Sequence, residues 1–264
     1  MDLTILLEKT KEIVKSASRL MLDASFEISK KGGECNIVTT ADTAVQDYLI
    51  ENLRSLIDKC GFFCEEKDVS DTEREYIWVI DPIDGTANFS RGIPECAISV
   101  ALTKDKEPLL GVVYNPYKNE LYSAIKGHGA YLNGEKISVS GKGFENSILC
   151  TAMSLYDKSH AEKCIDIIRD AYMKCNDVRR FGVCSLELCY IARGLCELYF
   201  EIRIFTWDYM AAYLILEEAG GILRGLSGEK MPFGRPTPLI GANSIENYKI
   251  LDSIVRKHLD TVPY

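Results

Sequence analysis

Two carboxylates three residues apart, Asp81 and Asp84, stand at the end of an apolar run and flank a proline. The proline fixes its own φ and favours extended backbone at Asp81. Gly85 follows, so the chain can approach a ligand closely, and the N–H groups of Gly85 and Thr86 can hold an anion. The two carboxylates and the Ile83 carbonyl suit a magnesium ion, and the N–H groups suit the phosphate that this ion would join to the protein. Asp-Pro and Asp-Gly are also ordinary turn dipeptides, so the segment alone leaves a plain turn open.

Further acids lie where the sequence predicts a strand end or a helix start. Glu65 and Glu66 follow an apolar strand, Asp208 opens a helix, and Asp42 follows a segment rich in hydroxyls. Each has an ordinary explanation, because adjacent acids are often a solvated loop and an Asp in the first turn caps a helix or complements its dipole. Brought together without a metal, these carboxylates would repel one another and some would have raised pKa values. A divalent cation removes that penalty.

Apolar periodicity predicts the elements that must position these acids. The first half is predicted to hold helices at 3–28 and from about Asp42 to 57, strands at 77–80, 96–104, 109–115 and 120–125, and turns at Asn115-Pro116 and Asn133-Gly134. The second half is predicted to hold strands at 147–151, 198–204 and 237–241 and helices at 158–174, 186–192, 207–219 and 245–258. The mixture indicates an α/β (α+β) fold in one domain, 1–264, with lobes of about 1–142 and 143–264.

Composition excludes several classes of protein. The chain has 264 residues, with 31 Lys and Arg against 39 Asp and Glu, a net charge of −8. This balance argues against sequence-independent nucleic-acid binding, which needs cations to displace counterions from phosphates. No segment approaches a membrane helix, and the N-terminus lacks the long apolar region of a secretory signal, so we expect a cytoplasmic protein. The ten cysteines and three histidines show no zinc spacing, and we expect reduced, mostly structural thiols.

The run Asp81-Pro82-Ile83-Asp84-Gly85-Thr86, followed later by Trp207-Asp208 and Gly220-Gly221, resembles the two signatures of the inositol monophosphatase family. Members of this family are magnesium-dependent, lithium-sensitive sugar phosphatases, and the resemblance covers nearly the whole chain. It implies a layered αβαβα sandwich, two to three Mg²⁺ ions per active site and a homodimer.

The resemblance also implies a role for each matching residue. The implied metal ligands are Glu66, Asp81 and the Ile83 carbonyl for the first ion, Asp81, Asp84 and Asp208 for the second, and Glu66 for a looser third. Gly85 and Thr86 match the phosphate-binding backbone, and Asp42 with the Thr86 hydroxyl matches the pair that orients the attacking water. The implied substrate residues are Glu201, Asp84, Gly182 and Cys184, with Lys31 and Arg203 as further candidates.

No Cys, Ser or His is arranged with a paired base, so we expect direct attack by a metal-activated water rather than a covalent intermediate. The expected substrate is a small phosphorylated polyol or sugar, with myo-inositol monophosphate first. A fructose 1,6-bisphosphate or a nucleotide 3′-phosphate is the alternative, in which Arg203 would meet a second phosphate. An alternative of a different class is a regulatory or RNA-associated binding protein that has kept the fold.

Overall fold

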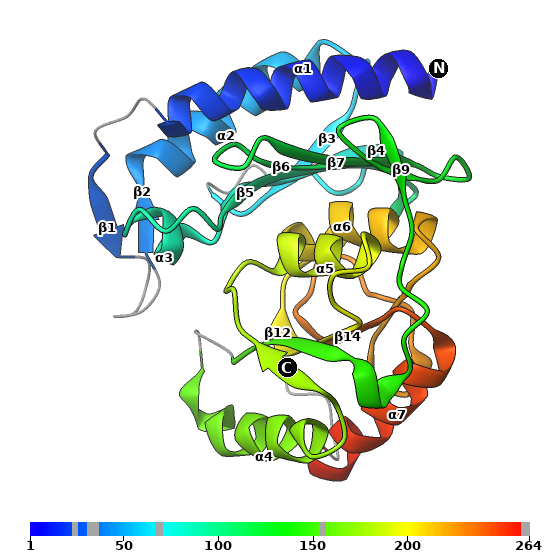
Figure 1. Cartoon of the computed structure of the whole chain (residues 1–264). Coiled ribbons are helices and arrows are strands. Elements are labelled where there is room, and N and C mark those ends of the chain that lie inside the picture. Colours follow the sequence, from blue (N-terminus) through cyan, green and yellow to red (C-terminus); the bar gives the residue numbers. More distant parts are fainter. Residues whose placement is uncertain (23–25, 31–36, 67–70, 154–156, 260–264) are drawn as a thin grey trace.

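The structure, a computed structural model, describes residues 1–22, 26–30, 37–66, 71–153 and 157–259. Helices and sheets alternate in five layers (Figure 1). From top to bottom these layers are helices α1 (Leu3–Leu22) and α2 (Thr40–Arg54), a seven-stranded sheet, helices α5 (Cys184–Ala192) and α6 (Thr206–Glu218), a five-stranded sheet, and helices α4 (Ala161–Tyr172) and α7 (Ile245–His258). The arrangement confirms the expected αβαβα sandwich.

The seven-stranded sheet consists of β3 (Gly61–Cys64), β4 (Tyr76–Asp84), β5 (Ala97–Lys104), β6 (Glu107–Asn115), β7 (Glu120–Ile125), β8 (Ala130–Leu132) and β9 (Glu135–Ile137), neighbouring in that order. β3 and β4 run parallel, and the later pairs are antiparallel. Asn133 and Gly134 join the last two strands with φ of 51° and 87°, as a two-residue hairpin turn requires. Both hairpin turns expected from the sequence are confirmed, since the chain also reverses between β6 and β7.

Helices cover both faces of this sheet, so β4 is apolar on both sides. Ile77 and Val79 pack in the core with α5 and α6, whereas Trp78 and Ile80 pack in the core with α1 and α2. Because side chains alternate along a strand, the next residue in the series 77, 79, 81 points toward α6. The strand therefore places Asp81 in the layer between the two sheets.

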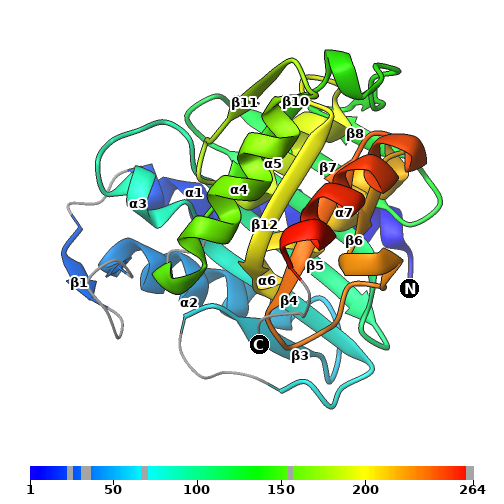
Figure 2. The same cartoon turned by 90° about the horizontal axis from the view of Figure 1, so that it is seen from below.

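The five-stranded sheet has the order β11-β10-β12-β14-β13, with β11 (Asp177–Arg179), β10 (Ile148–Ala152), β12 (Leu198–Ile204), β14 (Thr237–Ala242) and β13 (Ile222–Arg224). Figure 2 shows α4 and α7 lying across its outer face. Leu198 and Phe200 of β12 pack against these helices, whereas Tyr199 belongs to the core with α5 and α6. The same alternation points Glu201 toward the inner layer, where the candidate site lies.

Several predicted boundaries are wrong in the structure. The first helix ends at Leu22 rather than 28, because Ile28–Lys30 forms a strand, β1, paired with β2 (Ile37–Thr39). β4 continues through the proline to Asp84, with a shift of register between Asp81 and Asp84. The helix expected over 158–174 is a 3₁₀ turn, η2 (Lys158–His160), followed by the shorter α4. The remaining elements are α3 (Thr86–Phe89), η1 (Phe144–Asn146) and η3 (Leu226–Gly228).

Two expectations on composition concern the described part of the chain. The cysteines found there are all free, and all but Cys175 are buried. Each helix in the described ranges is too short or too polar to cross a bilayer. The division into two lobes within one domain stays a prediction.

Candidate metal centre

Three acids from two distant parts of the chain meet between the sheets. One carboxylate oxygen each of Asp81, Asp84 and Asp208 lies within 4.8 Å of the other two. Asp81 and Asp84 come from the end of β4, and Asp208 comes from the first turn of α6. The sequence predicted this convergence, and the structure brings the three residues together.

A backbone N–H group holds each carboxylate in place. Asp81 Oδ1 accepts from the N–H of Ile83 at 3.0 Å, and Asp84 Oδ2 accepts from the N–H of Ser185 at 2.7 Å. Asp208 Oδ2 accepts from the N–H of Phe205 at 2.9 Å. Fixed carboxylates form a preorganised ligand set, because little side-chain motion remains to be lost on binding.

Burial and mutual repulsion disfavour the charged forms of these acids. Desolvation raises the pKa of Asp81 well above its usual range, and the charges of Glu65, Asp84, Asp208 and Asp42 raise it further. Desolvation likewise raises the pKa of Asp84 to about 6. A divalent cation would stabilise the ionised carboxylates. An all-oxygen donor set fits a hard cation such as Mg²⁺ better than a softer metal.

The acid that lines the cavity next to this cluster is Glu65, whereas the resemblance implied Glu66. The N–H of Glu65 donates to the carbonyl of Ile80 at 3.2 Å, so the extended ladder of β3 continues to this residue. Phe63, two residues earlier, packs on Trp207 of α6, and alternation places Glu65 on the same side. Glu65 lines the cavity beside the cluster, and its charge acts on Asp81 and Asp208.

Glu66 points by the same alternation toward α2. Its N–H donates to Gln46 Oε1 at 2.9 Å, and the Gln46 amide donates back to its carbonyl. This paired contact fixes the backbone that carries Glu65. Alternation along β3 puts the two acids on opposite faces, but only the folded chain shows which of these faces meets α6.

Asp42 and Thr86 form the contact that the resemblance implies. The hydroxyl of Thr86 lies 3.2 Å from Asp42 Oδ1 and 3.0 Å from the carbonyl oxygen of Ile83. Asp42 is fully buried and is held by Thr39, which caps α2 and donates its N–H to Asp42 Oδ2 at 2.8 Å. The cap of α2 thus positions an acid beside the end of β4.

Gly85 occupies a position that only glycine fits. Its φ is +89°, and an added Cβ would lie 2.7 Å from Val183 Cγ2 and 3.1 Å from the carbonyl oxygen of Glu95. The residue precedes α3, so its backbone and that of Thr86 turn sharply just after Asp84. The positive φ and the close packing on Val183 and Glu95 explain why a glycine stands at this turn.

A cavity of about 370 Å³ opens beside these groups. It is lined by Ile83, Gly182, Cys184, Glu201 and most of the acids described above. Glu201 is buried, accepts a hydrogen bond from the Tyr199 hydroxyl at 2.6 Å, and has its pKa raised by burial to about 8. Four of the implied substrate residues, Glu201, Asp84, Gly182 and Cys184, thus line one cavity with the acid cluster.

Arg203 and Lys31 were the two further candidates for substrate binding. Arg203 lies beside the ring of Phe205, 6.0 Å from its centroid, and is not among the residues that line the cavity. Lys31 lies outside the described residues. Two arginines that the sequence analysis did not single out, Arg91 and Arg180, line the cavity instead, and the charge of Arg180 acts on Glu201. Only the folded chain reveals that they do, because neither belongs to a recognisable motif.

Fold and site together define a metal-dependent phosphatase. The chain belongs to the inositol monophosphatase family, whose pattern matches residues 3–259. It is similar to "Nus factor SuhB" of Escherichia coli K12, with 35% identity over 206 residues, 77% of each chain. It is also similar to "Inositol monophosphatase" of Mesembryanthemum crystallinum, with 34% identity over 82% of this chain and 85% of the other. The crystal structure of extragenic suppressor protein suhB from Bartonella henselae superposes with a TM-score of 0.89 at 26% identity, covering 97% of this chain and 100% of that one.

Proposed function

We propose that this phosphatase hydrolyses the phosphate monoester of a polyol, with myo-inositol monophosphate as the first candidate. The observation that carries the proposal is the meeting of Asp81, Asp84 and Asp208 within 4.8 Å beside the tight turn at Gly85. The turn suits a phosphate, and the carboxylates suit the cations that would neutralise it. Both lie on one cavity with a buried acid, Glu201, at its wall.

We propose a set of ligands for Mg²⁺ from this geometry, and the number of ions, two to three, from the resemblance. The members of this set are Glu65, Asp81, the Ile83 carbonyl, Asp84 and Asp208. When bound, such ions supply Lewis acidity and lower the pKa of a coordinated water. The protein fixes the ligands through backbone N–H groups, so the site is arranged before the substrate arrives.

Thr86 and Asp42 orient the attacking water in this proposal. The hydrogen of the Thr86 hydroxyl points to Asp42 Oδ1 or to the Ile83 carbonyl, which are both acceptors. The lone pairs of the same oxygen are then available to accept from water. Holding a nucleophile in line with the phosphorus accounts for a large part of the rate in phosphoryl transfer.

Glu201 is proposed to recognise the alcohol part of the ester. Its carboxylate accepts from the Tyr199 hydroxyl, and the residue lines the cavity. A carboxylate accepts hydrogen bonds from vicinal hydroxyls, which a polyol ring supplies. A second phosphate on the substrate would instead favour Arg180 or Arg91, which also line the cavity.

A substrate panel with measurement of released phosphate tests the proposal. The panel contains myo-inositol 1-phosphate, fructose 1,6-bisphosphate, a nucleotide 3′-phosphate and phenyl phosphate, each with Mg²⁺ and with a chelator. We expect magnesium-dependent release, fastest from the inositol ester, and a loss of at least about 100-fold in Asp84→Asn, in line with the removal of one electrostatic contact to a transition state. Faster release from the bisphosphate or the nucleotide would reassign the substrate, and release in the chelator would contradict the metal chemistry.

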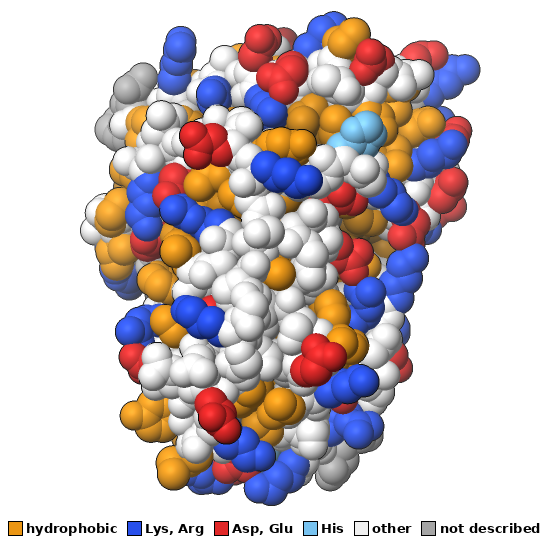
Figure 3. Space-filling view, turned by 45° about the vertical axis from the view of Figure 1, so that its right-hand side comes forward, with side chains coloured by type: hydrophobic (Ala, Val, Ile, Leu, Met, Phe, Trp, Pro, Cys, Tyr) orange, Lys and Arg blue, Asp and Glu red, His pale blue; other side chains and the backbone are white. Residues whose placement is uncertain are grey.

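A second candidate rests on the name of a relative, the Nus factor SuhB of Escherichia coli. We propose association with a nucleic acid or a transcription complex only as the runner-up, because the net charge is −8. On the face shown in Figure 3, Lys and Arg side chains are interspersed with Asp and Glu rather than gathered in one basic area. Retention of the chain by immobilised RNA at moderate salt, with no phosphate release in the panel, would favour this alternative.

Three further features, two implied by the resemblance and one, the location, expected from the sequence, are proposed without a structural argument. They are a homodimer, a cytoplasmic location and inhibition by lithium. Mass measurement by light scattering, fractionation of cells and assays with added lithium chloride test them separately. None of these results affects the assignment of the metal ligands.

A further inference from the structure

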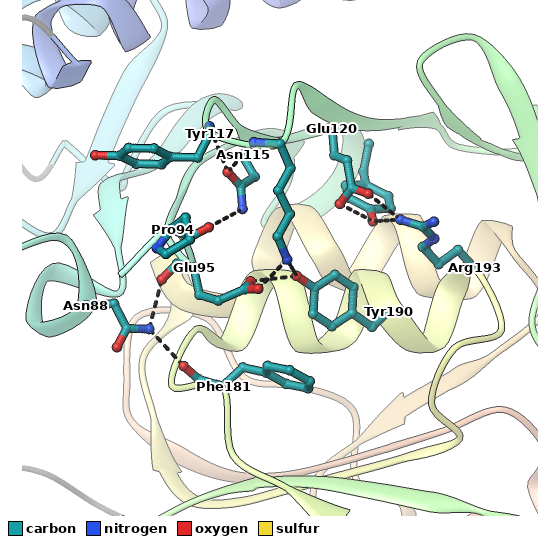
Figure 4. A network of polar contacts seen from close by, with 11 residues as sticks. Asn88, Pro94, Glu95, Asn115, Tyr117, Glu120, Phe181, Tyr190 and Arg193 are labelled. Carbon is teal, nitrogen blue, oxygen red and sulfur yellow. Dashed lines mark hydrogen bonds and ion pairs between the residues drawn. The ribbon is translucent and has the colours of Figure 1, made fainter. Parts of the chain in front are cut away.

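One wall of the cavity is a short segment, residues 181–183, between β11 and α5. Phe181 in this segment is fixed at three points. Its N–H donates to Glu187 Oε1 at 2.9 Å, and its carbonyl accepts from Asn88 Nδ2 at 2.8 Å. Its ring lies edge-on to the ring of Tyr190, with centroids 5.3 Å apart. Figure 4 shows the contacts of Asn88 and the neighbouring ring of Tyr190.

Asn88 joins three segments of the chain through one amide group. It lies on α3, just after Thr86, and its Nδ2 also donates to the carbonyl of Glu95 at 2.8 Å. Both partners of Nδ2 are carbonyl oxygens, so only the amide NH₂ can bond to them. The contact to Phe181 spans 93 residues and links the turn after the acid cluster to the cavity wall.

The wall segment also packs tightly against Gly85. The Cβ that glycine lacks would lie 2.7 Å from Val183 Cγ2 and 3.1 Å from the carbonyl oxygen of Glu95. The two segments that Asn88 connects are therefore the same two that enclose Gly85. A shift of the wall would change the shape of the cavity on the side where the alcohol part of the ester lies in our proposal.

Glu187 supports the segment from the other side. Its side chain is fully buried on α5, and its Oε2 has no hydrogen-bond partner among the described residues. Burial raises the pKa of this carboxyl well above its usual range. Burial therefore favours the neutral form of this carboxyl, and glutamine is close to that form in shape and charge.

We propose that Asn88 and Glu187 are positioning residues that clamp the Phe181 peptide and thereby fix the wall that orients the alcohol part of the substrate. The inference rests on the proposed function, because it concerns the ester bound in that cavity. Neither residue acts on the reacting atoms. Loss of either bond would therefore impair a bulky polyol ester more than a small ester that makes few contacts with the wall.

The first test compares Asn88→Asp with the matched variant Asn115→Asp. Asn115 belongs to the same network but is remote from Phe181: its Nδ2 donates to the carbonyl of Pro94 at 3.1 Å. Asp at position 88 would set a carboxylate against two carbonyl oxygens. We expect the ratio of kcat/KM for the best polyol ester of the panel to kcat/KM for phenyl phosphate to fall at least about tenfold, or ~1.4 kcal/mol. We expect no change of this ratio in Asn115→Asp, and unfolding temperatures show whether both variants fold.

The second test compares Glu187→Gln with Glu187→Ala and decides the matter if Asn88→Asp fails to fold. Glutamine keeps the acceptor for the Phe181 N–H, so we expect Glu187→Gln to have the wild-type ratio of the two kcat/KM values. We expect Glu187→Ala to lower this ratio as Asn88→Asp does. An unchanged ratio in folded Asn88→Asp, an equal fall in Asn115→Asp, or equal defects in the two Glu187 variants would overturn the inference. The failure of the proposed function looks different, because the wild-type protein would then release phosphate from none of the esters.

Discussion

The hydroxyl of Thr86 lies 3.2 Å from Oδ1 of Asp42, and this contact joins the start of α2 to the start of α3, just after β4. Asp42 is buried and is itself held by the backbone N–H of Thr39. The hydroxyl therefore has an acceptor with a fixed position. In the proposed mechanism, this contact between two elements orients the attacking water.

Thr86→Ala is expected to lower kcat by about 100-fold, since a misplacement of a reacting group by about 1 Å can cost a factor of this order. The affinity for Mg²⁺ should change little, because the carboxylates of the cluster keep their backbone partners. Steady-state kinetics and a Mg²⁺ titration measure the two quantities. Thr86→Ser keeps the hydroxyl and should retain most of the activity. An equal loss of metal affinity and turnover in Thr86→Ala would contradict the role given to this residue.

The proposal of Glu65 in place of Glu66 as a metal ligand gives a second prediction with a built-in control. Glu65→Gln should reduce both magnesium affinity and kcat by at least about tenfold, because a ligand charge next to the cluster is lost. Glu66→Gln should change magnesium affinity much less, since the contacts of Glu66 with Gln46 are made by its backbone. Titration with Mg²⁺ followed by activity compares the two variants. A larger defect in Glu66→Gln would restore the original assignment.

Gly85 and Gly92 provide a matched pair for the tight turn. Both have positive φ, +89° and +70°, but an added Cβ meets Val183 and the Glu95 carbonyl only at Gly85. Gly92→Ala should cost about 1–2 kcal/mol of stability, the cost of a left-handed backbone for alanine. Gly85→Ala should cost about 1–3 kcal/mol more from overpacking and should abolish most activity. Denaturant unfolding and kinetics test this, and similar effects in both variants would show that the close approach at Gly85 is unimportant.

Glu187 predicts a dependence of stability on pH. Burial raises its pKa in the folded protein above the ordinary value of 4.5. Above that pH the unfolded chain releases the proton while the folded protein keeps it, so the free energy of unfolding falls as pH rises. Glutamine does not titrate, so the stability of Glu187→Gln relative to the wild type should grow as pH rises. The expected slope is about 1.4 kcal/mol per pH unit until the pH reaches the pKa of Glu187 in the folded protein. Denaturant unfolding at a series of pH values and constant Mg²⁺ measures the difference in stability between the two proteins. A difference that does not change with pH would show that the pKa of Glu187 is not raised.

The sequence allowed the acid cluster to be predicted because its members lie in short, distinctive segments. Asp81 and Asp84 flank a proline at a strand end, and Asp208 follows Trp207 at a helix start. Each of these patterns is local, and the layered fold brings the three carboxylates together. The role of Gly182 and Cys184 in substrate binding is predicted by the resemblance to the family and not by a local sequence pattern.

The remaining features depend on contacts that sequence position does not show. The role of Asn88 arises from a bond to a residue 93 positions away. The choice between Glu65 and Glu66 required knowing which face of β3 each core covers. Three-residue strands such as β1 and β13 are too short for periodicity to indicate, because their pairing partners stabilise them.

Anomalous diffraction from crystals grown with Mn²⁺ and phosphate tests the central claim most directly, because manganese replaces magnesium at oxygen ligands and can be located by its own signal. We predict anomalous peaks between the carboxylates of Asp81, Asp84 and Asp208, next to Glu65, with phosphate density at the turn of Gly85. Peaks only elsewhere on the protein, or no peak at the cluster with phosphate present, would contradict the account.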